Sequence, residues 1–443
     1  MRASLQHPAR LVPLAFLLAV AVGTVLLMLP VARAGDGSAP PLTALFTSTS
    51  AVCVTGLIVE DTPVYWSEFG QVVILVLFQI GGFGIMTGAT LLGLLVTRRI
   101  RLRDRLIAQA ETKTLGLGDV TGVLRLILLV TVAVELAITA ILTLRLRFAY
   151  DETWGRAVWN GLFHAVSAFN NAGFSTYSDS LMGFVVDPLI VIPIMVAIML
   201  GGLGFPVLYE LRREVRRPSR WSVHTKITLA ATGLLLVGGF VAILLAEWNN
   251  PATLGPLDKG GKLLASAFHS VSARTAGFNS LDVSALGPET LLVNDMLMFV
   301  GGGSAGTAGG IKVTTFFLLG FAIWAEIRGD PDTTAFGRRI PFGAQRQALT
   351  VALLGVALVA VGTLALLALT DFGLSAVLFE TASAFATVGL STGITPDLPP
   401  AAQVVVIVLM FVGRVGSITV ATALALRSRS KGYRYPEERP IVG

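Results

Sequence analysis

One stretch of the sequence decides the fold: FETASAFATVGL at residues 379–390. Its first half, Phe-x-x-x-Ser-Ala, has helical spacing, and its second half places a glycine before a bulky apolar residue. The pattern occurs three more times, as FTSTSAVCVTGL at 46–57, FHAVSAFNNAGF at 163–174 and FHSVSARTAGF at 268–278, the last being one residue shorter. Because each copy lies between two apolar stretches, the chain is built from internal repeats.

Composition places the chain in a lipid bilayer. Of its 443 residues, 54% are hydrophobic and 14% are charged, and the mean hydropathy of +0.76 excludes a soluble globular protein. Apolar stretches near the length of a bilayer span occur at residues 11–31, 72–96, 123–144, 189–208, 227–246, 348–369 and 404–426, and another at 291–324 is broken in its middle. We interpret the first stretch as a retained transmembrane helix, because it is long for a signal peptide and ends in a poor cleavage site.

Charge alternates from one connection to the next. The net charge of +6 comes mainly from basic residues at 98–113, 212–226, 328–346 and 427–439, whereas the other connections carry mainly acids such as Asp61, Asp151 and Asp179. The positive-inside rule therefore predicts a multi-pass protein of the cell membrane with both termini and the basic connections in the cytoplasm. The charge reports topology in a lipid bilayer, and nucleic-acid binding is not expected.

The second apolar stretch of each unit also repeats, as IGGFG at 80–84, LGGLG at 200–204, VGGGS at 300–304 and VGRVG at 412–416. The repeating unit is thus a span, a short re-entrant helix, a glycine-containing loop and a second span. We expect units at residues 1–113, 114–221, 222–340 with its second span broken at 301–310, and 341–443 with a cytoplasmic tail. Two spans per unit give all units one orientation, which is a parallel repeat.

These repeats predict an all-α integral membrane protein with eight transmembrane spans in a pseudo-fourfold arrangement around one pore. Non-helical backbone at membrane depth is tolerated only where it is buried in protein or lines a water-filled cavity, so the loops should converge on one axis. Rings of backbone carbonyls there can replace the hydration shell of a cation. A glycine in each loop allows the positive φ that turns the carbonyls inward.

The fourth copy, Thr387-Val388-Gly389-Leu390, resembles the Thr-Val-Gly-Tyr-Gly filter of potassium channels, and the other copies look like degenerate versions of it. With the glycine-broken span, the chain resembles the Trk/Ktr/HKT superfamily of K⁺ transporters over essentially its whole length. The match is closest to the Ktr-type membrane subunit, because Trk-type subunits carry extra N-terminal spans and this chain starts with the first repeat. The resemblance implies channel-like K⁺ uptake with ions bound at Val54, Thr55, Gly56, Asn171, Ala172, Gly173, Thr275, Ala276, Gly277, Thr387, Val388 and Gly389.

Two features are costly in a membrane. The segment GGGSAGTAGG at residues 301–310 cannot easily stay helical, because each glycine costs about 1 kcal/mol relative to alanine. Arg414 replaces a glycine of the other units, and a guanidinium at that depth costs at least about 2.5 kcal/mol. The resemblance implies a pore-obstructing gate made of Gly301, Gly302, Gly303, Ser304, Ala305, Gly306, Thr307, Ala308, Gly309, Gly310, Lys312 and Arg414. The alternatives are a helix break filled by neighbours, and cations paired with acidic residues in helix packing.

The resemblance also implies partners. It suggests a homodimer with a pore in each subunit, and a cytoplasmic ring of nucleotide-binding regulatory subunits docked on the basic inner face. No covalent cofactor is expected; K⁺ is the transported ion, and nucleotide enters only through the partner. The single Cys53 excludes an internal disulfide framework, and the equivalent positions of His164 and His269 favour packing over a metal site.

Other functions remain open at this point. A Na⁺-selective or Na⁺-coupled relative is the nearest, and Gly56 speaks against it, because some family members carry serine there. An alternating-access carrier usually shows inverted repeats, whereas these are parallel. A membrane enzyme is disfavoured, because no motif or cluster of titratable residues marks a catalytic site.

Overall fold

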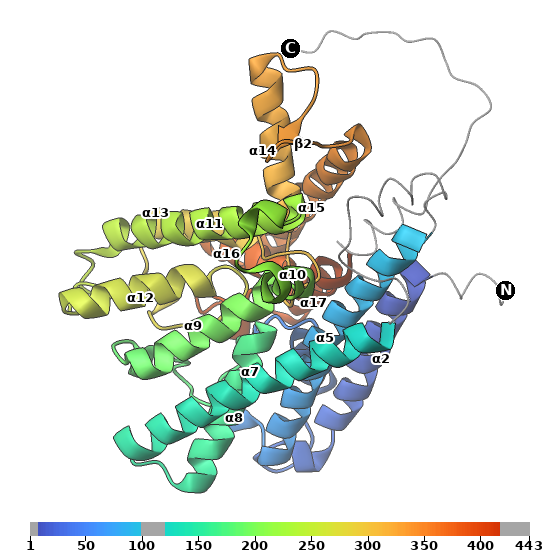
Figure 1. Ribbon diagram of the computed structural model, residues 1–443. Helices are drawn as coiled ribbons and strands as arrows, with labels where there is room; N and C mark the ends of the chain where they lie inside the picture. The colour runs from blue at the N-terminus through green and yellow to red at the C-terminus, as the bar shows by residue number, and fades with distance from the viewer. Residues whose placement is uncertain (1–7, 99–119, 417–443) are drawn as a thin grey trace, which may run out of the picture.

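The computed structural model describes residues 8–98 and 120–416 (Figure 1). The basic residues expected at 99–113 and 427–439, the end of the last expected span and the C-terminal tail lie outside this part of the chain. The described residues are mostly helical, and their strands form one short antiparallel hairpin, β1 (Thr334–Ala335) and β2 (Arg338–Arg339).

Each copy of the motif forms a short helix, as its spacing predicts. These helices are α3 (Pro41–Val52), α8 (Trp154–Asn170), α12 (Lys259–Ser272) and α16 (Leu374–Ala386). Each follows a longer apolar helix: α2 (Pro8–Leu27), α7 (Val120–Ala149), α11 (Val223–Glu247) and α15 (Phe342–Leu369). The motif phenylalanines, Phe46, Phe163, Phe268 and Phe379, are fully buried.

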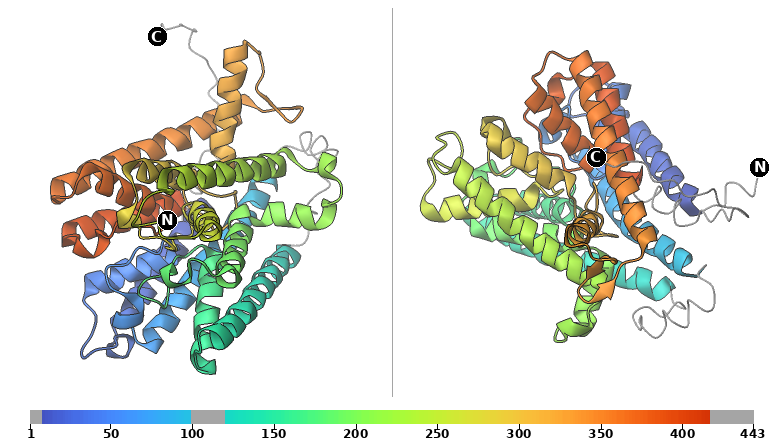
Figure 2. Two further views of the ribbon diagram at one scale, coloured as in Figure 1. Left: turned by 90° about the vertical axis from the view of Figure 1, so that its left-hand side faces the viewer. Right: turned by 90° about the horizontal axis from the view of Figure 1, so that it is seen from above.

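The helices that follow the glycine loops differ from unit to unit. They are α5 (Glu68–Arg98), preceded by the single turn α4 (Thr62–Tyr65), then α9 (Pro188–Leu203) with α10 (Phe205–Glu214), α13 (Pro288–Phe299) with α14 (Val313–Arg328), and α17 (Pro400–Phe411). Among these helices, as far as residues up to 416 describe them, α5 is the one that is long and uninterrupted. The chain between α13 and α14 is non-helical, which matches the expected break at 301–310. Both Figures 1 and 2 show α14 projecting away from the bundle rather than continuing the line of α13.

Contacts between units run in a cycle. The second-span helix of each unit packs against the short helix of the next: α5 against α8, α9 against α12, α13 against α16, and α17 back against α3. Each short helix also packs against the first helix of its own unit, as α8 does against α7. The short helices therefore lie inside a shell formed by the longer ones.

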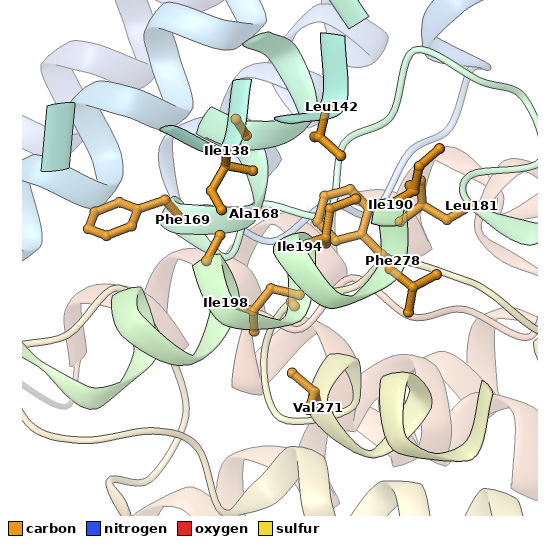
Figure 3. Packing of buried hydrophobic residues seen from close by; sticks show 14 of the residues in the cluster. Ile138, Leu142, Ala168, Phe169, Leu181, Ile190, Ile194, Ile198, Val271 and Phe278 are labelled. Atoms are coloured by element: carbon orange, nitrogen blue, oxygen red, sulfur yellow. The ribbon is translucent and has the colours of Figure 1, made fainter. Parts of the chain in front are cut away.

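A cluster of buried apolar side chains joins the second and third units (Figure 3). It includes Ile138 and Leu142 of α7, Phe169 of α8, Ile194 of α9 and Val271 of α12. Lipid tails are as apolar as these side chains, so close packing rather than exclusion of water stabilises such a cluster in a bilayer.

Helix length and composition identify part of the expected spans. Within the described residues, four helices are long and apolar enough to cross a membrane, at Glu68–Gly88, Leu124–Ala149, Val223–Glu247 and Phe342–Leu369. The pair α9 and α10 would be a fifth, but its two helices are bent by 100°. The protein is therefore a multi-pass helical membrane protein.

Candidate functional site: a ring of four glycine loops

The loops after α3, α8, α12 and α16 share one pattern of left-handed residues. Two left-handed residues, separated by one residue, occur in each loop, and the second is always the motif glycine. The first members, with their φ angles, are Val54 (56°), Asn171 (58°), Thr275 (104°) and Thr387 (50°); the glycines are Gly56 (91°), Gly173 (71°), Gly277 (74°) and Gly389 (96°). Positive φ is uncommon outside glycine and concentrates at functional sites, so these four loops are built for a purpose other than connection.

The serine of each motif holds its loop in place through hydrogen bonds. Its backbone carbonyl accepts a hydrogen bond from the residue before the glycine: Thr55 to Ser50 at 2.7 Å, Ala172 to Ser167 at 2.7 Å, Ala276 to Ser272 at 2.9 Å and Val388 to Ser383 at 2.9 Å. The hydroxyls of Ser50 and Ser383 accept from the glycine amides, each at 3.1 Å. The hydroxyls of Ser167 and Ser272 instead donate to the carbonyls of Phe174 and Phe278. The motif thus joins a helix C-terminus to a defined loop.

The four glycines meet one another in order around a ring. A Cβ added to Gly56 would lie 2.5 Å from the Ala172 carbonyl oxygen, and one added to Gly173 would lie 2.8 Å from that of Ala276. A Cβ on Gly277 would meet the Val388 carbonyl, and one on Gly389 would meet the Thr55 carbonyl. Each glycine therefore faces a carbonyl of the next loop, and the fourth loop closes on the first. No side chain fits at any of these positions without moving a neighbouring loop.

The ring opens on one side into a cavity of about 200 Å³. All four motif glycines line it, together with Asp61 and Asp179. Tyr177, which also lines the cavity, donates to Glu152 at 2.6 Å and accepts from Asn160 at 3.0 Å. Burial, and then the hydrogen bond to Glu152, raise the pKa of Tyr177, so this phenol stays neutral. The mouth of the ring is polar and carries acidic side chains.

Polar side chains support the loops from behind. His164, directly after the motif phenylalanine, places Nε2 2.9 Å from Ser175 Oγ, and His269 places Nε2 2.9 Å from the amide nitrogen of Asn294. These contacts are consistent with the packing role expected for both histidines. At the same position in the fourth copy, Glu380 is fully buried and accepts hydrogen bonds from Ser391, at 2.8 Å, and from Thr395. Glu380 was not among the expected site residues, although it aligns with the two histidines in the repeat.

The glycine-rich segment 301–310 lies against the ring on its other side. A Cβ on Gly309 would meet the hydroxyl of Thr387, a member of the fourth loop. The segment is also attached to the second unit, because Gly303 N donates to the Gly202 carbonyl at 2.8 Å and Thr307 N donates to the Gly201 carbonyl at 3.1 Å. The structure therefore brings the expected gate and the expected filter into contact.

A second helix break, which the sequence analysis did not predict, adjoins this segment. Gly204 has φ of 90° and separates α9 from α10, and the Phe205 amide donates to the Ala305 carbonyl at 3.3 Å. Hydropathy runs through residues 189–208 without interruption, which hid the break. The local signal was Gly204 followed by Pro206, because proline is favoured in the first turn of a helix.

Three cationic side chains bind carbonyls of the segment. Arg414 Nη1 donates to the Thr307 carbonyl, Lys312 Nζ to the Ala308 carbonyl at 2.5 Å, and Arg274 Nη2 to the Gly301 carbonyl at 2.8 Å. Arg414 is 2% exposed and lies in a π-helical turn, Val412–Gly416. Within residues 8–98 and 120–416, Arg414 and Lys312 contact backbone carbonyls. The alternative of a pairing with an acidic residue would require carboxylates at these positions.

Comparison with known proteins finds relatives over nearly the whole chain. A family model described as TrkH, cation transport protein, matches residues 15–433. The chain is 39% identical to Ktr system potassium uptake protein B of Bacillus subtilis (strain 168), over 98% of this chain and 97% of that protein. It is 38% identical to the protein of the same name from Vibrio alginolyticus, over 98% and 94% of the two chains. It is 35% identical to the potassium/sodium uptake protein NtpJ of Enterococcus hirae, over 98% and 97%.

One solved structure is similar in fold. The crystal structure of the potassium transporter TrkH from Vibrio parahaemolyticus superimposes with a TM-score of 0.72, covering 94% of this chain and 84% of that one. The sequence identity is 17%, so this likeness concerns the fold alone.

Proposed function

The chain belongs to the TrkH family of cation transport proteins, and from this membership we propose that it takes up K⁺ through a filter made of its four glycine loops. The family transports ions across membranes and is not a family of enzymes. The observation that carries the proposal is the closed ring, in which each positive-φ glycine faces a carbonyl of the next loop.

The ring supports ion selection for a physical reason. Successive residues alternate between left-handed and ordinary backbone, which turns consecutive carbonyls toward one side, and a dehydrated cation needs such oxygens in place of its water. The hydroxyls of Thr55 and Thr387 are buried and have no hydrogen-bond partner in the described part of the chain. They are additional oxygens that an ion could engage at the base of the filter.

The contacts of residues 301–310 support a gate beneath the filter. The segment lies against Thr387 and is attached to Arg414, Lys312 and the bent helix pair α9–α10. A non-helical loop held by a few hydrogen bonds is an element that can take two positions within a few kcal/mol. We propose that its displacement opens the pore.

The proposed assembly follows the family resemblance. It has eight spans in a pseudo-fourfold arrangement, and the cyclic contacts from α5–α8 to α17–α3 support that order. It forms a homodimer in the cell membrane, with both termini and the basic connections in the cytoplasm. A nucleotide-binding regulatory ring docks on the basic inner face; the relatives are named as parts of a Ktr system, which supports a separate regulatory component.

A second candidate is Na⁺ transport, alone or coupled to K⁺. The similarity of the chain to a protein named for both potassium and sodium uptake supports Na⁺ transport as the second candidate. Gly56 weighs against it, since the resembled Na⁺-selective proteins carry serine there.

Flux into liposomes separates these candidates. Purified protein in vesicles loaded with K⁺ should accumulate radioactive Rb⁺, and external K⁺ should compete far better than external Na⁺. Equal competition by Na⁺ would favour the second candidate. Absence of Rb⁺ uptake by folded, reconstituted protein would contradict the proposed function.

A further inference from the structure

One pair of positions makes contact in every unit. The residue two places after the motif serine meets the first glycine of the following span, and in three units the contact is backbone to backbone. The pairs are Val52 carbonyl with Gly81, Phe169 carbonyl with Gly201 and Phe385 carbonyl with Gly413. In each of these units the second span therefore packs directly on the end of the re-entrant helix.

The third unit makes the same contact in another way. Its aligned residues are Arg274 and Gly301, and here the Arg274 guanidinium donates to the Gly301 carbonyl at 2.8 Å. The helix has already ended at Phe299, so Gly301 is the first glycine of the broken segment rather than part of a packed helix. A single side chain replaces the backbone packing of the other units.

The third loop, which contains Arg274, also differs from the other three loops. It is one residue shorter than the other loops, and Thr275, directly after Arg274, has the largest of the four φ angles, 104°. Arg274 is 6% exposed, and its Nε has no hydrogen-bond partner in the described part of the chain. A cavity of about 30 Å³, room for one water molecule, adjoins Arg274, Asn171 and Gly302. The contact is thus a single, incompletely satisfied hydrogen bond with space beside it.

We infer that Arg274 is a positioning residue that couples the third filter loop to the glycine-rich segment, so that displacement of the segment alters ion selection as well as passage. The inference rests on the proposed function, in which the loops are the filter and residues 301–310 are the gate. Two rigid bodies in backbone contact move together, but a bond through one side chain can break when the segment moves. Among the four loops, the third is thus the one that meets the aligned glycine of its following span through a side chain rather than through backbone packing.

A mutant cycle tests the coupling. Arg274→Gln should lower the ratio of Rb⁺ to Na⁺ permeability by roughly tenfold, the effect of losing a charge-assisted hydrogen bond. Arg274→Lys, which keeps the charge and one donor, should restore part of the ratio. In protein lacking residues 304–308, whose segment no longer holds its position, Arg274→Gln should change the ratio little further. Arg145→Gln is the matched control, because this half-exposed arginine pairs with Asp187 away from the ring.

The outcomes are distinguishable. An Arg274→Gln variant with the parental ratio, or equal fold-changes with and without residues 304–308, would overturn the coupling while leaving Rb⁺ uptake and the proposed function intact. If Arg274→Gln does not fold, the same cycle with Arg274→Lys decides, and a parental ratio there, or equal fold-changes in both backgrounds, counts against the coupling. Failure of the parental protein to transport would instead contradict the proposed function.

Discussion

At the scale of single residues, the ring of glycine loops is determined by where Cβ atoms are excluded. Gly56 and Gly393 have almost the same φ, 91° and 93°, but a Cβ on Gly393 meets no atom within 4 Å. Substitutions at the two glycines therefore distinguish two effects: the strain of a side chain on left-handed backbone, and the collision of its Cβ with a neighbouring loop. Backbone strain is common to both positions, and displacement of a carbonyl occurs only at Gly56.

The first prediction uses this pair. Gly56→Ser should raise the permeability of Na⁺ relative to K⁺, because the new Cβ pushes the Ala172 carbonyl of the second loop while the remaining loops stay in place. Gly393→Ser should leave that ratio unchanged and cost less thermal stability, because only the strain of a left-handed side chain applies there. Liposome flux in K⁺ and Na⁺ gradients gives both ratios, and a Gly56→Ser protein with the parental ratio would contradict a four-loop filter.

Glu380 carries the second prediction at this scale. It binds Ser391 and Thr395, both of which line the cavity at the mouth of the ring, so replacing its carboxylate disturbs hydroxyl groups that an entering cation meets. Glu380→Gln should raise the K⁺ concentration needed for half-maximal uptake while leaving the maximal rate nearly unchanged. Asp371→Asn, which neutralises an exposed carboxylate just before α16, is the control. A shift of equal size in both variants would show a general surface-charge effect rather than a local one.

At the scale of secondary-structure elements, local patterns predicted more than hydropathy did. Phe-x-x-x-Ser-Ala located the four short helices, and the run of glycines located the break after α13. The break at Gly204 was missed because uninterrupted hydropathy outweighed the local signal of Gly204 and Pro206. The π-helical turn around Arg414 was missed because it depends on contacts with residues 301–310, which are distant in sequence. The positive φ of Val54, Thr275 and Thr387 was also missed, since β-branched residues disfavour it; only Asn171 belongs to a residue type that is enriched there.

The broken segment carries the prediction that belongs to this scale. Deleting residues 304–308 should raise K⁺ flux and make it less dependent on a regulatory subunit, because the deletion removes the part of the segment that binds Gly201 and Arg414. Arg414→Ala should act in the same direction, through loss of the bond to Thr307 and of a buried positive charge near the ion path. Initial rates of Rb⁺ uptake measure both effects.

Arg328→Ala provides the comparison for Arg414→Ala. Arg328 is an exposed arginine at the end of α14, stacked on Trp324, and its loss should not change the rate. If the deletion and Arg414→Ala both give folded protein that conducts at the parental rate, the segment is only a structural break and the gating proposal is wrong.

At the scale of the whole molecule, composition alone predicted a membrane protein, and the repeats alone predicted the order of its helices and loops. Within the described residues, the length and hydropathy of the helices identify four spans, or five with the bent pair. The eight spans therefore stay a prediction from the repeats, as does their orientation. Neither the homodimer nor the regulatory ring follows from the geometry of one chain.

Cysteine labelling tests the orientation. The native Cys53 is buried, so a new cysteine can be followed without removing it. A cysteine at the exposed position Asp179, on the cavity side of the ring, should react with an impermeant thiol reagent added outside intact cells, whereas one at the exposed position Ser219 should react only after the membrane is opened. Reaction of both from outside would refute the positive-inside assignment.

The closure of the ring between the fourth loop and the first also constrains how the protein is made. Gly389 faces the Thr55 carbonyl, and α17 packs against α3, so the earliest and latest re-entrant helices must meet before the ring exists. A ribosome completes the first of these long before the last. Until then the growing chain has only an open arc of loops. If the ring is the proposed filter, we expect no continuous ion path before the last loop is in place, so the bilayer that receives the chain should keep its electrical resistance throughout synthesis.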